Sequence, residues 1–133
     1  MKIPVKIGWE LIFILMIPFI SMLYEFSKNP KITIIILALC YLLFVGFTVF
    51  GIKYEIQDNN LEIINTFFGK TKINIHEIIR IEKTWNMIAS PAPSILGRVE
   101  IYYIGNSIVI SPKHFEDLKN QLLKINPKIT VKL

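Results

Sequence analysis

Ile32-Thr-Ile-Ile-Ile-Leu-Ala-Leu-Cys-Tyr-Leu-Leu-Phe-Val-Gly-Phe-Thr-Val-Phe-Gly-Ile52 is a run of 21 residues without a charged side chain. A helix rises about 1.5 Å per residue, so this run is long enough to cross the ~30 Å hydrocarbon core of a bilayer. Its Ile, Leu, Phe and Val side chains favour insertion at each position. The run therefore predicts a membrane-spanning helix over 32–52. Cys40 within it is the single cysteine of the chain, which excludes an intrachain disulfide.

The residues before this run predict a second span over about 7–26. Leu11–Tyr24 is uncharged but short for a crossing, and the longer range places Glu10 and Glu25 at its two ends. An ionisable group in a span is a functional candidate, although a solvated carboxylate at the interface is the simpler interpretation. Pro18 should kink this helix, which membrane helices tolerate. A cleaved signal peptide is the alternative, but the bulky residues after the run do not form a small-x-small cleavage motif.

The polar link Ser27–Lys31 is so short that the two predicted helices must be antiparallel neighbours. Lysines flank one side of the pair at positions 2, 6, 53, 70 and 72, and the other side at positions 28 and 31. The positive-inside rule therefore predicts that the protein lies in the cell membrane with both termini, and the domain after the spans, in the cytoplasm.

The composition changes near Ile52 and Lys53, which predicts a membrane hairpin over 1–52 and a separate domain over 53–133. The formal charge is +5, with four basic and two acidic side chains in the first part and eleven and eight in the second. This excess is scattered rather than gathered into a stripe, which argues against a nucleic-acid partner. Lysines beside apolar segments more often contact lipid headgroups, so the predicted partner is the lipid bilayer.

The second part begins with strand-like segments and ends in one helix. Alternating or β-branched runs occur at Lys53–Gln57, Leu61–Asn65, Thr71–Ile75, from Ile78 toward Trp85, at Arg98–Ile104 and at Ser107–Ile110, with turn residues at 58–60, 69 and 105–106. Ser111 is the predicted N-cap of the final helix and Pro112 its first residue.

The predicted helix has one apolar face, formed by Phe115, Leu118, Leu122 and Ile125, and it ends at Asn126-Pro127. Strands followed by one amphipathic helix predict an α+β domain, in which a small antiparallel sheet or partial barrel is covered at an open end or face by the helix.

Three stretches resemble the bacterial PH-like family of YyaB type: Trp85–Ser94, Arg98–Tyr103 and Ile108–Pro112. The family shows a Ser-Pro-Ala segment, a later Arg that opens a strand, and an Ile-Ser-Pro entry into the last helix. The resemblance covers about Lys53 to Ile125, and it implies that the partial barrel capped by a helix is PH-like. Gly97 stands where the family tends to carry Asp, so any pairing or capping role of that Asp does not carry over.

The paired spans and the PH-like part together resemble the sublancin immunity protein group, which protects a producing bacterium from its own secreted glycopeptide bacteriocin. The resemblance implies a bacterial cell-membrane protein that binds the toxin or shields its target. Its expected partner is thus a bacteriocin peptide or the membrane target of that peptide. A general membrane-anchored PH-like scaffold without a toxin role is the alternative, and the sequence leaves the oligomeric state open.

Five residues are candidates for contact with a partner or a membrane: Phe67, Phe68, Lys70, Trp85 and Arg98. Aromatic residues beside a lysine could touch a bilayer surface, whereas packing of both Phe side chains in the core is the simpler interpretation. Trp85 could be an interface hot spot, although an aromatic that closes a strand is commonly part of the core. Arg98 could recognise an anion, or it could pair with a local carboxylate such as Glu82 or Glu100.

Familiar chemical motifs are not recognisable in the sequence. The first predicted hairpin, Asp58–Asn60, is acidic and neutral, whereas clustered phosphates need converging Lys and Arg side chains. His76 and His114 are far apart and have no motif partners, and the sequence contains no Walker-type, GxGxxG, HExxH or GxSxG pattern. We therefore expect a protein that is not an enzyme and uses no cofactor or metal.

Overall fold

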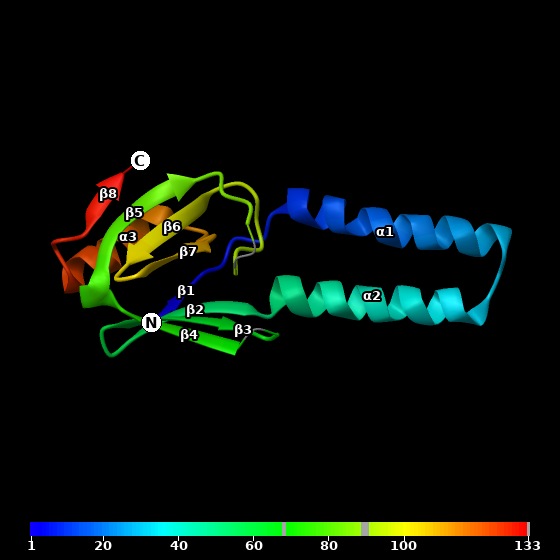
Figure 1. The fold of residues 1–133 in the computed structure, drawn as a ribbon, viewed down its shortest axis with the longest axis horizontal. Helices are drawn as coiled ribbons and strands as arrows, with labels where there is room; N and C mark the ends of the chain where they lie inside the picture. Colours follow the sequence, from blue (N-terminus) through cyan, green and yellow to red (C-terminus); the bar gives the residue numbers. More distant parts are fainter. Residues whose placement is uncertain (68, 89–90, 133) are drawn as a thin grey trace.

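Two long helices stand side by side and extend from one end of a β-rich domain (Figure 1). The computed structural model describes residues 1–67, 69–88 and 91–132. Helix α1 spans Trp9–Lys28 and helix α2 spans Ile32–Phe50. Both are long and apolar enough, by length and composition, to cross a membrane. The two predicted helices are therefore present, with the first displaced by about two residues toward the C-terminus.

Helix α1 continues through Pro18, the position at which a kink was predicted. Proline lacks a backbone N–H, so it weakens the hydrogen bonding of the preceding turn. The hydroxyl of Tyr41, on α2, donates to the carbonyl oxygen of Leu15 in that turn at 2.6 Å. This bond joins the two helices inside their apolar region, where a hydroxyl without a partner would be costly.

The first sheet contains four antiparallel strands in the order β1-β2-β3-β4. They are β1 (Lys2–Ile3), β2 (Ile52–Gln57), β3 (Asn60–Asn65) and β4 (Gly69–Asn74), and the short 3-10 helix η1 (Ile75–Glu77) follows. The turn between β2 and β3 holds Asp58 and Asn59 at positive φ, 49° and 64°. These are residue types that two-residue hairpin turns favour, as the sequence predicted.

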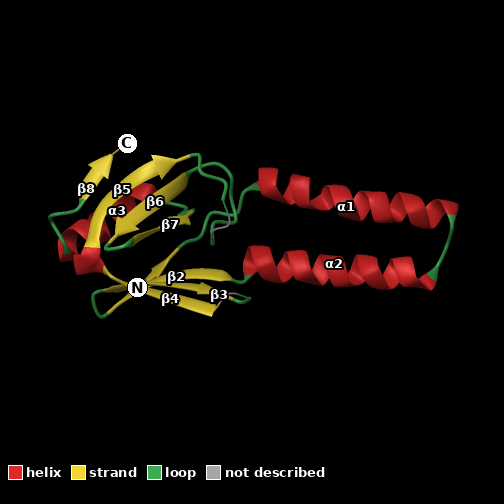
Figure 2. Ribbon diagram, viewed as in Figure 1, coloured by secondary structure: helices red, strands yellow, loops and turns green. Residues whose placement is uncertain are grey.

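The second sheet has the order β7-β6-β5-β8 and lies across the core from the first (Figure 2). Its strands are β5 (Ile78–Thr84), β6 (Arg98–Tyr103), β7 (Asn106–Ile110) and β8 (Thr130–Lys132). β8 pairs parallel with β5 and was not expected from the sequence. The β6–β7 hairpin is confirmed, but Asn106 already belongs to β7, so its turn lies one residue earlier than predicted.

Helix α3 (Phe115–Ile125) completes the hydrophobic core. Its Leu118 and Leu122 are fully buried in one cluster with strand residues of both sheets, such as Leu61 and Ile101. The side-chain amide of Asn126, just after the helix, donates to the carbonyl oxygens of Ile75 and Ile78 at 3.0 and 3.2 Å. The α+β class and the capping helix are as predicted.

The start of α3 differs from the prediction. Ser111 is not its N-cap; His114 takes that position. Ser111 is instead buried, where its carbonyl accepts from the N–H of Lys6 at 2.8 Å and its hydroxyl donates to the Lys6 carbonyl at 3.1 Å. Because its polar groups bond to this distant segment, Ser111 is held in the domain and the helix starts later.

The first eight residues also differ from the prediction, which assigned them to the membrane hairpin. Ile3 is buried in the core, and β1 pairs with β2. The N–H of Lys113 donates to the carbonyl of Pro4 at 2.8 Å, and the N–H of Gly8 donates to the carbonyl of Pro93 at 2.9 Å. Residues 1–8 are thus part of the β-rich domain, and α1 starts from a segment fixed on both sides.

Candidate functional site

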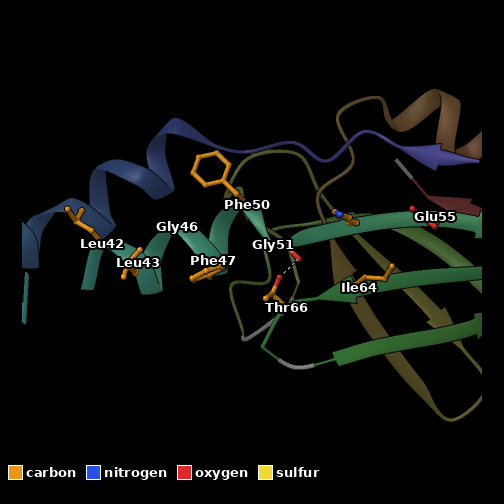
Figure 3. Close-up of a pocket in the computed structure, with 10 residues that line it drawn as sticks. Leu42, Leu43, Gly46, Phe47, Phe50, Gly51, Glu55, Ile64 and Thr66 are labelled. Carbon is orange, nitrogen blue, oxygen red and sulfur yellow. Dashed lines mark hydrogen bonds between the residues drawn. The ribbon is translucent and has the colours of Figure 1, made fainter. Parts of the chain in front are cut away.

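A groove of about 650 Å³ lies where α2 meets the first sheet (Figure 3). The helix supplies an apolar wall and the strands supply a mixed wall. The lining residues are Leu42, Leu43, Gly46, Phe47, Phe50, Gly51, Lys53, Glu55, Ile64 and Thr66. The groove therefore begins on a helix apolar enough to cross a membrane and continues onto the outer face of the sheet.

Two glycines shape this groove. A Cβ on Gly51 would lie 2.3 Å from the carbonyl oxygen of Phe47, so only glycine allows this tight passage from helix to strand. The Thr66 hydroxyl donates to the Gly51 carbonyl at 2.9 Å and holds the end of β3 against the end of α2 (Figure 3). A Cβ on Gly46 would meet nothing within 4 Å, so the missing side chain leaves open space in the wall.

The charged residues that line the groove, Lys53 and Glu55, lie at its sheet end. Lys53 and Glu55 alternate with the buried Tyr54 on β2, so their side chains lie on the outer face of the first sheet. Ile64 pairs with Lys53 and with Lys70, on the two neighbouring strands. An apolar wall beside a charged rim suits a ligand with an apolar part and a polar part.

The sequence candidates Phe67 and Lys70 lie near this groove. Phe67 is half exposed and stacks on α2, with its ring centroid 5.4 Å from that of Phe44 and 6.3 Å from that of Phe47. The interpretation that it packs in the domain core is wrong, because it covers the helix end instead. Lys70 pairs with Glu62 at 2.6 Å. Phe68 lies outside the described residues.

Trp85 lies on a different segment, the connection between β5 and β6, and Arg98 is the first residue of β6. Trp85 is 77% exposed, so the interpretation of this side chain as part of the core is wrong. A hydrophobic strand ends at Thr84, one residue before it, and Trp85 follows on the surface. The five sequence candidates therefore do not form one site, although the β3–β4 and β5–β6 connections both lie on the end of the domain from which the helices extend (Figure 1).

Arg98 is 6% exposed and holds this connection together. Its guanidinium donates to the carbonyl oxygens of Ser94, Asn86 and Ala92 at 2.6, 2.9 and 3.2 Å. Its partners among the described residues are thus carbonyl oxygens and not Glu82 or Glu100, so the predicted carboxylate pairing is wrong. Burial lowers the pKa of Arg98 from its ordinary value. Among the described residues, Arg98 thus orders the loop by bonding three of its carbonyl oxygens.

Glu10, a functional candidate at the end of the first predicted span, makes a contact that the sequence did not indicate. Its Oε1 accepts from the Ser94 hydroxyl at 2.8 Å and from the N–H groups of Ile95 and Leu96 at 3.0 Å each. A Cβ on Gly8 would lie 2.1 Å from this oxygen, so glycine leaves the space that the carboxylate occupies. The simpler interpretation of a solvated carboxylate is therefore wrong. The acidic residue at a helix start was the visible signal, but its partner 84 residues away was not.

Tyr54 links the same connection to the rest of the domain. Its hydroxyl donates to the carbonyl oxygen of Pro91 and accepts from the N–H of Ser111 at 3.1 Å. Burial of the ring raises the pKa of Tyr54 to about 12, so the hydroxyl stays protonated at neutral pH and can donate. The β5–β6 connection is thus fixed from the core by Tyr54 and Arg98, and from the first helix by Glu10.

Comparison with known proteins gives one family. A family model described as "Bacterial PH domain" matches residues 52–126, from the start of β2 to the residue after α3, which is more than half of the chain. No curated protein and no solved structure matches the sequence.

Proposed function

The chain belongs to the bacterial PH domain family, and from this premise we propose that it is a membrane-anchored immunity protein that protects a producing cell from a bacteriocin peptide. In this proposal α1 and α2 cross the cell membrane, and the PH domain and both chain ends lie in the cytoplasm. Two helices of sufficient length and apolarity support the anchor. The excess of lysines on the domain side supports the orientation.

The groove between α2 and the first sheet is the observation that carries the proposal. Apolar peptide toxins partition into the bilayer, so a protein that meets them needs an apolar surface at membrane level. The wall formed by Leu42, Leu43 and Phe47 offers that surface. Lys53 and Glu55 lie where the polar part of such a peptide would emerge.

Protection would come from binding alone, without chemistry on the toxin. A peptide held in the groove is removed from the target it would otherwise reach in the same membrane. Because anchor and groove share helix α2, toxin and binding site are confined to one membrane, where their effective concentration is high. The resemblance of the paired spans and PH-like part to the sublancin immunity protein group points to a sublancin-type glycopeptide as the toxin.

A membrane-anchored scaffold that docks another protein is the second candidate, and β4 favours it. This strand lies at the edge of the first sheet. Most of its residues are exposed, and Lys72 is among them. An edge strand of this kind accepts an extended segment from a partner through backbone hydrogen bonds. In that case the partner would sit on the sheet edge and not in the groove.

A killing assay tests the immunity proposal. A sensitive bacterium expressing the full chain is challenged with sublancin and, in parallel, with an unrelated bacteriocin, after membrane expression has been verified. Survival against sublancin alone supports specific immunity. Death in both arms, with the protein present in the membrane fraction, contradicts it and leaves the scaffold as the better proposal.

A further inference from the structure

The described residues of the β5–β6 connection, 85–88 and 91–97, expose several large apolar side chains. Trp85, Met87 and Ile88 are 77%, 62% and 75% exposed, and Leu96 is about half exposed. Large apolar side chains exposed along one short segment mark a candidate contact site, because water solvates them poorly. We propose that this connection inserts its apolar side chains into the headgroup and acyl boundary of the bilayer, as a third membrane contact beside α1 and α2.

The structure holds these side chains outward. The hydroxyl of Thr84 accepts from the N–H of Asn86 at 3.1 Å, and the side-chain oxygen of Asn86 accepts from the N–H of Ile88 at 3.0 Å. Arg98 fixes the carbonyl of Asn86 from inside the domain. The backbone bonds thus point inward or along the loop, and the side chains of Trp85 and Ile88 remain on the surface.

The bilayer is the occupant because of where the connection lies. Figure 1 shows it at the start of α1, on the end of the domain from which both helices extend. The bonds from Ser94, Ile95 and Leu96 to Glu10 fix it to the first turn of that helix. If α1 enters the membrane at Trp9, the connection lies at headgroup level, where tryptophan is favoured.

The charge around the connection fits the same surface. The Lys6 ammonium lies beside Gly97, 3.2 Å from the place a Cβ would take there. Lys83 precedes the exposed segment by two residues. Oε1 of the Glu10 carboxylate accepts from three donors of the connection. Lysines beside apolar side chains suit a membrane surface that carries anionic lipids.

This inference rests on the proposed membrane crossing of α1 but not on the immunity role. The proposed contact would hold the domain in one orientation, because it adds a third point of attachment to the membrane beside the two helices. The groove beside α2 would then stay at a fixed depth relative to the lipid surface.

The experiment uses the full chain reconstituted into vesicles that contain anionic phospholipid. The Trp9→Phe variant leaves Trp85 as the single tryptophan. We expect a blue-shifted emission, poor quenching by acrylamide, and stronger quenching by lipid spin-labelled near the headgroup than by lipid labelled near the chain end. The control carries Trp9→Phe, Trp85→Phe and Ile104→Trp, since exposed Ile104 lies beyond β6 at the far end of the domain. Its emission should be that of tryptophan in water.

Two results would overturn the inference, and they are distinguishable. If the protein floats with the vesicles but Trp85 emits as in water and is quenched by acrylamide, the loop does not touch lipid and its apolar surface awaits a protein partner. If the protein does not float with vesicles after reconstitution, the membrane crossing itself fails. The killing assay reports on immunity independently of both results.

Discussion

Oε1 of Glu10 lies 2.8 Å from the hydroxyl oxygen of Ser94, so the first turn of an apolar helix is bonded to a loop of the PH domain. The same oxygen accepts the N–H groups of Ile95 and Leu96. Helix α1 and the domain are thus joined by a charged side chain as well as by the backbone. Hydrogen bonds to charged groups are the stronger ones, so this contact should resist local opening.

Glu10→Ala should therefore loosen the loop without unfolding the domain. We expect the amides of Ile95 and Leu96 to exchange hydrogen faster by about tenfold, since each loses its acceptor. Hydrogen exchange of the full chain in detergent, read by mass spectrometry, measures this. Glu25→Ala is the matched control, because Glu25 is an exposed carboxylate near the other end of α1. Equal exchange in the two variants would show that the contact is not formed.

Arg98→Lys should destabilise the domain although it keeps the positive charge. A lysine ammonium cannot reproduce the planar fork that reaches the carbonyls of Ser94, Asn86 and Ala92. We expect a loss of about 2–4 kcal/mol in the free energy of unfolding, from buried carbonyls left without donors. Denaturant unfolding of the full chain measures it, with exposed Lys113→Arg as the control. A change of less than about 0.5 kcal/mol, typical of surface sites, would contradict this role.

The sequence predicted correctly those elements whose formation depends on residues close to one another in the chain. The apolar run at 32–52, the hairpin at Asp58–Asn59 and the apolar face of α3 were all readable, because each depends on neighbours close in sequence. β1 and β8 were missed because a strand of two or three residues carries almost no periodicity. Each forms by pairing with a strand that is distant in sequence, β1 with β2 and β8 with β5.

The candidate site was less predictable for the same reason. Trp85 follows a β-branched strand and was expected in the core. The neighbouring residues do not determine whether this side chain faces the core or the solvent, and in the structure it is exposed. Glu10 and Ser94 are 84 residues apart, and a single sequence gives no sign of that pairing. Phe67 and Lys70 were named because an aromatic beside a lysine at a turn is a visible pattern; Phe67 packs against α2 and Lys70 pairs with Glu62, and their role as contact residues stays a prediction.

The stability of the domain should fall as the pH rises from about 10 to about 12, in part because of Tyr54. Its pKa is raised to about 12 in the folded state, whereas an unfolded tyrosine titrates near 10. Between these values the unfolded chain releases a proton that the folded chain retains, so unfolding becomes easier. Below about pH 10 both states are protonated and the contribution is fully present.

Tyr54→Phe provides the comparison for this pH effect. At about pH 9 the variant should be less stable by about 1–3 kcal/mol, because the Ser111 N–H loses its buried acceptor. As the pH approaches about 12, the wild-type protein loses stability that the variant does not lose, so the difference should shrink. Urea unfolding at several pH values measures both curves. Parallel curves would mean that Tyr54 does not titrate differently on folding.

Ile3→Ala should destabilise the PH domain, although residue 3 lies outside the region matched by the family. Ile3 is 4% exposed within the core, so its truncation should cost about 2–4 kcal/mol of unfolding free energy. Pro4→Ala is the control, since that neighbouring side chain is exposed. Denaturant unfolding of both variants, with the helices held in detergent, makes the measurement. If the two variants were equally stable, the N-terminal strand would be only loosely attached.

Gly46→Phe should abolish protection if the groove binds the toxin. The glycine lines the groove, and a Cβ there meets nothing within 4 Å, so the ring can enter the open space without displacing the backbone. We expect the toxin dose that kills half of the cells to fall by about tenfold or more, because about 1.4 kcal/mol of lost binding already changes affinity tenfold. Survival curves of the expressing strain measure it.

Ile36→Phe places the same aromatic ring on the same helix but outside the groove, at an exposed position. It controls for expression, membrane insertion and the presence of a new aromatic ring on α2, so it should protect as well as the wild-type protein. Loss of protection in both variants would point to a damaged helix pair, and retention in both would exclude the groove as the toxin site. Only a loss confined to Gly46→Phe assigns the toxin to the space beside α2, because there alone the aromatic ring enters the groove.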